Sequence, residues 1–302
     1  MGRRGQRTLL GVAALGLIAA AAAPPIALLR WIAPGTDAIA AATRRPPECL
    51  APPSDAAQRN RVEVGRAVFR TPLLLGGTAG NIGIACETCH RSGRGNPALA
   101  IDGVSGAPGT ADVTSAMLGP HRSDGIANPK IVPDLAGPID RSPARLRALM
   151  TELVVHEFAG RSPPEAVLDG LVAYVAALDA RHCAAGDVAY RLADDIDAAA
   201  RAVAAAGQAL DRRDTPTAAL LLAAARTELG RIAERFPRDA SVVTRIVAAS
   251  RSLQAIRLTR DPAAAARALA AWRGQWPKLA ARLHAREARS LYDPTRLAAA
   301  LR

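Results

Sequence analysis

The ten residues IACETCHRSG (84–93) place two cysteines three positions apart, with a histidine directly after the second. A Cys-x-x-Cys-His run is compatible with a redox-active dithiol, with half of a zinc site or with covalent attachment of haem. The rest of the sequence distinguishes among these three kinds of site.

A thioredoxin-type dithiol requires a preceding strand, but residues 73–84 contain four glycines and no clear strand. A structural zinc ion requires four ligands, and the remaining cysteines, Cys49 and Cys183, are distant from the motif and from each other. Haem attachment needs two thioether bonds and an adjacent histidine within one turn. The motif therefore predicts one haem c, bound covalently through Cys86 and Cys89, with His90 as a ligand of its iron.

The N-terminus has the parts of an export signal. Residues 1–7 contain three arginines, and residues 8–29 are uncharged. A positive segment followed by an apolar one is typical of a secretory signal, and the apolar run is about as long as the ~20 residues that span a bilayer. We expect residues 1–33 to be a signal peptide or an uncleaved membrane anchor. Either places the remainder in the periplasm, an oxidising compartment in which haem c is attached.

Composition favours helices. The chain of 302 residues is 50% hydrophobic and only 3% aromatic, and alanine, which loses no side-chain entropy in a helix, fills much of its C-terminal half. The net charge of +12 is uneven, since residues 187–302 carry twenty basic and twelve acidic side chains. We interpret this excess as a solvated helical surface, with attraction of anionic lipid headgroups or an acidic protein partner as the alternative, and we expect no nucleic acid partner.

Three segments follow the N-terminal one along the chain. Residues 34–57 contain five prolines and predict a linker. The cofactor domain, 58–183, begins with a helix over 58–70, continues through a region rich in Gly, Pro and Asn over 76–138, and ends with helices after Ser142 and Ser162. Residues 187–302 predict a helical bundle or helical hairpins, with breaks at 214–216, 237, 261–262, 277 and 293–294.

Over residues 58–179 the chain resembles class I c-type cytochromes. The motifs are GRAVF (65–69), CETCH (86–90) and LVAYV (171–175). The order GRAVF, CETCH, NPKIVPDL (128–135) and a helix ending in Met150 is most similar to one haem-bearing half of the bacterial dihaem cytochrome c peroxidases. The resemblance implies an all-α cytochrome c-like domain in which Gly65 lets the first and last helices cross closely.

The position of Met150 before the closing helix is where this family has its axial methionine, which makes Met150 the first candidate for the sixth iron ligand. Met150 also completes an apolar stripe with neighbouring leucines, which is a purely structural alternative. Met117 and then His121 are the next candidates. Cys49 and Cys183 flank the domain, and in an oxidising compartment they are expected to form a disulfide, with two free thiols or an intermolecular bridge as alternatives.

A His/Met pair closes the iron and suits electron transfer, so the first hypothesis is a carrier that exchanges electrons with a periplasmic redox protein. The second is a peroxidase-related enzyme or a ligand sensor with an open iron, although the family enzymes carry two Cys-x-x-Cys-His motifs and this chain carries one. The third is a helical adaptor to which the cytochrome is attached. Trp272 and Trp276, four residues apart, are expected to belong to the helical core.

Overall fold

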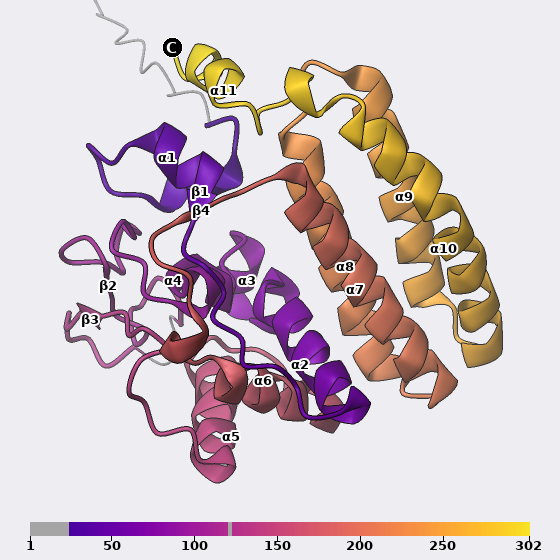
Figure 1. The fold of residues 1–302 in the computed structure, drawn as a ribbon. Helices are drawn as coiled ribbons and strands as arrows, with labels where there is room; N and C mark the ends of the chain where they lie inside the picture. The colour runs from indigo at the N-terminus through magenta and orange to yellow at the C-terminus, as the bar shows by residue number, and fades with distance from the viewer. Residues whose placement is uncertain (1–23, 120–122) are drawn as a thin grey trace, which may run out of the picture.

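The computed structural model describes residues 24–119 and 123–302, which form a mostly helical protein in two packed parts (Figure 1). The all-α class is confirmed for this portion of the chain, since its strands are only two antiparallel pairs of two residues each. The N-terminal part contains α1 (Ala38–Thr43), α2 (Ala56–Phe69), α3 (Gly77–Asn81), α4 (Cys86–Cys89), α5 (Pro143–Thr151) and α6 (Glu165–Ala177). The C-terminal part contains α7 (Leu192–Asp211), α8 (Thr215–Glu234), α9 (Ala240–Leu258), α10 (Pro262–His284) and α11 (Pro294–Ala300). The strand pairs are β1 (Arg44–Arg45) with β4 (Val188–Ala189) and β2 (Thr110–Ala111) with β3 (Lys130–Ile131).

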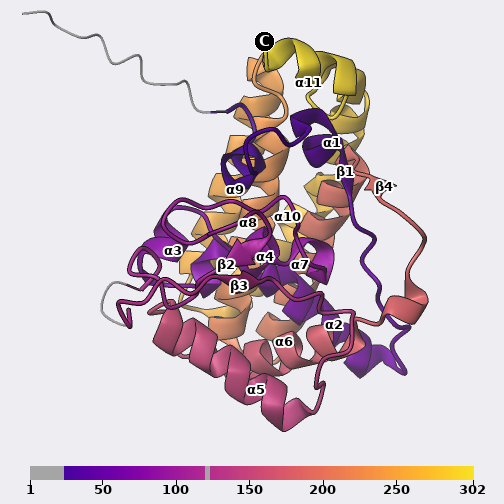
Figure 2. The same ribbon diagram turned by 90° about the vertical axis from the view of Figure 1, so that its left-hand side faces the viewer.

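The N-terminal part is organised by the crossing of α2 and α6 (Figure 2). Gly65 of α2 lies directly on Gly170 of α6, and a Cβ atom at Gly65 would overlap the Gly170 carbonyl. Beside this contact the ring centroids of Phe69 and Tyr174 are 5.1 Å apart. Helix α5 packs along α6 and lies below α4 in the view of Figure 2, and residues of α2, α5 and α6 line the same cavity as the Cys-x-x-Cys-His segment.

The four long helices α7 to α10 form a closed bundle, because each packs on the next and α10 packs back on α7. Aspartates cap the starts of α8, α9, α10 and the short α11: the side chains of Asp214, Asp239, Asp261 and Asp293 each accept a hydrogen bond from a backbone N–H in the first turn that follows. The break expected at Pro277 is wrong, since α10 continues through this residue. Proline removes one backbone hydrogen bond, but packing of α10 on α7 and α9 keeps the helix continuous.

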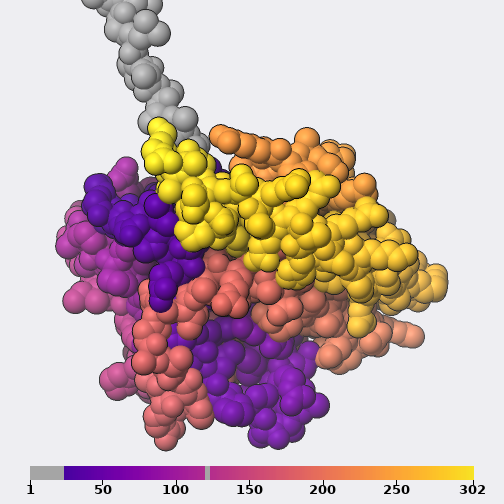
Figure 3. All heavy atoms as spheres, turned by 45° about the horizontal axis from the view of Figure 1, so that its top comes forward, coloured from indigo at the N-terminus to yellow at the C-terminus, as the bar shows by residue number. Residues whose placement is uncertain are grey.

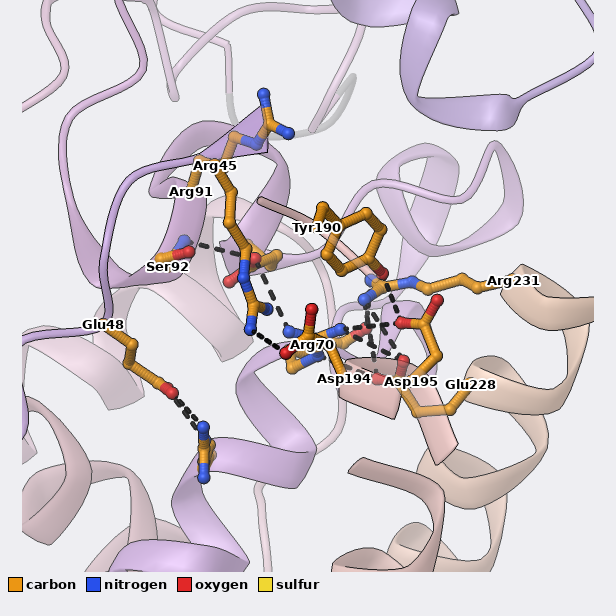
Figure 4. Close-up of polar contacts among 12 residues, drawn as sticks. Arg45, Glu48, Arg70, Arg91, Ser92, Tyr190, Asp194, Asp195, Glu228 and Arg231 are labelled. Atoms are coloured by element: carbon orange, nitrogen blue, oxygen red, sulfur yellow. Dashed lines mark hydrogen bonds and ion pairs between the residues drawn. The ribbon is translucent and has the colours of Figure 1, made fainter. Parts of the chain in front are cut away.

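The two parts share one apolar core, because α2 packs on α7 and α8. At this boundary Arg70, the residue after α2, makes two hydrogen bonds to Glu228 of α8, with Nε–Oε1 and Nη2–Oε2 distances of 2.8 and 3.1 Å. Figure 4 shows Arg70 also facing Asp195 of α7, whose carboxylate accepts hydrogen bonds from the hydroxyls of Tyr190 and Tyr292. The amino-acid composition therefore changes at residues 183–187, but the apolar core is shared by the parts on either side of them.

The linker expected over residues 34–57 is only partly observed. Residues 46–53 form no helix and only one isolated bridge, but the preceding residues form α1 and β1, and β1 pairs with β4. Glu48 accepts hydrogen bonds from Arg66 (2.9 Å, Nε) and from the Tyr174 hydroxyl (2.8 Å), so this segment is bound to the α2–α6 crossing. The prolines indicated a segment without helix, but they gave no information on these distant partners.

Residues 24–33 belong to the folded protein, which corrects the expected extent of the signal or anchor segment. Ile26 is buried in a small core with Ala42, Leu291 and Leu297, and the Ala27 N–H donates to Glu234 (3.0 Å). Figure 3 shows α11 beside this N-terminal segment at the surface. Residues 1–23, which contain most of the predicted signal, lie outside the described residues. Across 24–119 and 123–302, no helix combines the length and apolar character needed to cross a membrane.

Candidate functional site

Helix α4 is a single turn that presents the cysteine pair and the histidine together. The Ala85 N–H donates to the Thr88 hydroxyl at the start of the turn (3.0 Å), and the His90 N–H donates to the Cys86 carbonyl at its end (2.8 Å). These local bonds require only the residues of the motif and its immediate neighbours. Cys86, Cys89 and His90 consequently all line one cavity.

The cavity has a volume of about 300 Å³ and an almost entirely apolar lining. Its walls come from α2, α4, α5, α6 and the loops over 101–118 and 133–139. Apart from the motif, the lining comprises Phe69, Leu74, Leu75, Ile84, Ala85, Ile101, Ala111, Val113, Leu118, Pro133, Leu135, Ile139, Leu146, Leu149, Met150, Leu153, Val154, Phe158, Leu171 and Val175. Leu149 is 48% exposed at the edge of this lining. A concave apolar site with a few convergent polar groups is typical of cofactor sites.

His90 is oriented by the backbone of the 133–139 loop. Its Nδ1 lies 3.1 Å from the Pro133 carbonyl oxygen, so the tautomer with a proton on Nδ1 satisfies this acceptor. Burial lowers the pKa of His90 to about 4, against smaller opposing effects of Pro133 and Asp134. The imidazole is therefore neutral at pH 7 and has Nε2 available, the arrangement in which histidine binds metals.

A second set of contacts fixes the loop that holds His90. Arg94 donates from Nε and Nη2 to the carboxylate of Asp134, the residue after Pro133, with an Nη2–Oδ2 distance of 2.6 Å. Arg94 Nη1 lies 2.9 and 2.8 Å from the sulfur atoms of Cys49 and Cys183, which form a disulfide. Arg94 thus connects the Cys49–Cys183 disulfide, the pair expected from the sequence, to the loop that holds His90.

The three candidates for a sixth ligand differ in position. Met150, in the last turn of α5, lines the cavity together with His90. Met117 is partly buried but is not part of the lining, and His121 lies outside the described residues. The π-helical turn Glu152–Glu157 begins two residues after Met150, and turns of this kind are frequent at functional sites. Of the described candidates, only Met150 shares the cavity with the motif.

The cysteine environment differs from that of the competing kinds of site. Burial raises the pKa of Cys86 to about 12 and that of Cys89 to about 11, whereas a reactive dithiol requires a lowered thiol pKa. Helix α3 and a loop, rather than a strand, precede the motif. Within the described ranges no group of three or more His, Cys, Asp and Glu residues is placed to bind a metal ion, so the usual four-ligand zinc set is not assembled there.

Comparisons of this chain with protein-family models, with curated proteins and with solved structures find no match. What the protein does must therefore be inferred from its own residues. Sequence reasoning missed Pro133, Arg94 and Asp134 as supports of His90. The only local signal was the Pro-Asp pair within NPKIVPDL, whose partners lie about forty residues earlier in the chain.

Proposed function

We propose that this protein is an exported mono-haem c-type cytochrome of the class I kind, which transfers electrons in the periplasm. The observation that supports this most strongly is the convergence of Cys86, Cys89, His90 and Met150 on one apolar cavity. These residues fit the group chemically, since they offer two thiols for thioether bonds and two soft or borderline iron ligands. Haem c, when bound, supplies a one-electron ferric/ferrous couple.

The residues of the chain then have distinct roles. Cys86 and Cys89 would hold the cofactor covalently, and His90, oriented by Pro133, would offer Nε2 to its iron. Met150 would offer its thioether sulfur from the last turn of α5. The apolar lining would exclude water from a bound haem, which would disfavour its more highly charged oxidised form. An edge near Leu149 gives a redox partner access to the site.

Peroxidase chemistry is less well supported. Cleavage of an O–O bond is assisted by an acid–base side chain close to the iron, but among the described lining residues the ionisable ones are Cys86, Cys89 and His90. All three are already used for attachment and ligation. Met150 in the same cavity also favours a closed iron, which is the state that suits an electron carrier.

The effect of Met150→Ala on carbon monoxide binding tests this function. We expect the ferrous wild-type protein, purified after export, to show c-type absorption bands that carbon monoxide leaves unchanged. Met150→Ala removes the sixth ligand, so its ferrous bands are expected to shift almost completely on addition of carbon monoxide. Optical spectra measured before and after the gas is added provide the readout, and Met117→Ala is the matched control, expected to resemble the wild type.

Several outcomes would contradict the proposal. A wild-type protein that binds carbon monoxide readily would have an open iron, and the enzyme or sensor hypothesis would then be preferred. A shift in Met117→Ala but not in Met150→Ala would assign the ligand to Met117. Release of the haem by acidified acetone would exclude covalent attachment and with it the c-type assignment.

A further inference from the structure

A second concave site lies on the bundle, between α9 and α10, with α7 and α8 separating it from the N-terminal part (Figure 1). This groove, which we call the α9–α10 groove, has a volume of about 340 Å³. Its walls are residues at helical spacing on the two helices: Arg245, Ala248, Ala249, Ser252, Trp272, Gln275, Trp276, Lys278, Leu279 and Arg282. Nothing in the proposed electron-transfer function uses it.

The groove is strongly cationic. Residues 240–284 contain eight Arg and Lys side chains and one acid, Asp261. Arg245, Lys278 and Arg282 are exposed at the groove, and its lining contains no carboxylate. Within the described part of the chain none of these three forms an ion pair with a carboxylate. Uncompensated like charges repel one another, so an anionic ligand would be bound favourably here.

The floor of the groove is aromatic and held in place. The rings of Trp272 and Trp276 are stacked, with centroids 5.2 Å apart and an interplanar angle of 17°. The Trp272 indole N–H donates to the Ala249 carbonyl of α9 (3.1 Å). Trp276 remains partly exposed beside Leu279. Tryptophan and arginine in a concave site are the residue types that contribute most to protein–protein binding.

We propose that the α9–α10 groove docks an acidic segment of a protein partner, with an apolar side chain of that segment on Trp276 and its carboxylates on Arg245, Lys278 and Arg282. A bilayer fits less well, because Trp272 is only 8% exposed and the tryptophan pair forms the floor of a groove. Tryptophan serves membrane binding where it reaches the lipid interface. This proposal does not depend on haem binding, and it gives the bundle a docking role.

The test uses the full-length purified protein and a fluorescein-labelled ten-residue peptide in which glutamate pairs alternate with leucine pairs. Fluorescence anisotropy measures its affinity at moderate salt. The double variant Lys278→Glu/Arg282→Glu is expected to weaken binding at least about tenfold. The control Arg251→Glu/Arg267→Glu makes the same change in net charge at exposed positions of α9 and α10 outside the groove. We expect this control to lose no more than about threefold in affinity, because charges outside the groove act mainly through screened long-range attraction. Trp276→Ala is expected to weaken binding about tenfold.

Other results would overturn the proposal. Equal losses in the two double variants would mean that diffuse charge, not the groove, attracts the peptide. Absence of peptide binding at millimolar concentration would remove the docking role. Phosphatidylglycerol vesicles or a thymidine oligonucleotide that bind more tightly than the peptide, with the same dependence on Lys278 and Arg282, would identify a lipid or nucleic acid ligand instead.

Discussion

Replacing Gly65 with alanine is expected to destabilise the fold by about 2–3 kcal/mol, although alanine is normally the better helix former by about 1 kcal/mol. The reason is the crossing of α2 and α6, where a Cβ atom at Gly65 would overlap the Gly170 carbonyl and approach the Leu171 amide. Both neighbours are backbone atoms, which cannot rotate away as a side chain can. Urea unfolding of the purified protein measures the loss in free energy of unfolding.

Gly230→Ala is the matched control. Gly230 lies on the exposed side of α8, and a Cβ atom there would meet no atom within 4 Å. Alanine should therefore stabilise the protein by about 0.5–1 kcal/mol through helix propensity alone. If Gly65→Ala also raised the free energy of unfolding, the result would contradict the close contact between α2 and α6 at Gly65.

Glu228→Gln is expected to cost about 3–5 kcal/mol, because it leaves the buried Arg70 guanidinium without its main counter-charge. Glu228 is 3% exposed and accepts both hydrogen bonds from Arg70 across the boundary between the two parts (Figure 4). Arg231 lies 3.5 Å from the same carboxylate. The variant keeps the shape of the side chain, so the loss in free energy of unfolding reports on charge. Glu165→Gln, which removes one of the two acidic partners of Arg147 at an exposed site and leaves Asp169, should change stability by no more than about 0.5 kcal/mol.

This pair also predicts a pH dependence. Burial by itself would raise the pKa of Glu228, but the charges of Arg231 and Arg70 outweigh it and lower the pKa from 4.5 to about 2. A carboxylate with a lowered pKa stabilises the fold above its ordinary pKa and loses that contribution as the pH falls toward the folded value. The stability difference between wild type and Glu228→Gln should therefore be largest above pH 4.5 and shrink between about pH 4.5 and 2. A difference that is constant with pH would show that Glu228 does not act as a charge.

Much of the secondary structure could be predicted from local sequence. The helix expected over 58–70 is α2, and those expected after Ser142 and Ser162 correspond to α5 and α6. The apolar stripe of α6 is buried, whereas that of α5 is only partly buried, with Leu149 48% exposed. Breaks at Asp214, Asp261 and Asp293 were visible because an aspartate followed closely by proline caps a helix through its own first turn. The tryptophan pair, interpreted as core, is core only for Trp272, while Trp276 forms the partly exposed floor of a groove.

The sequence by itself determined the chemistry of residues 86–90, because one helical turn brings two thiols and an imidazole together without any distant partner. Only the tertiary structure decided what surrounds that turn: Met150 in the cavity, the Pro133 carbonyl on His90, and Arg94 between Asp134 and the disulfide. It also decided that Gly170 is the partner of Gly65 and that one arginine among many, Arg70, is buried against Glu228. Local propensities depend on neighbours within one or two turns, whereas these contacts depend on which distant surfaces the packed core brings together.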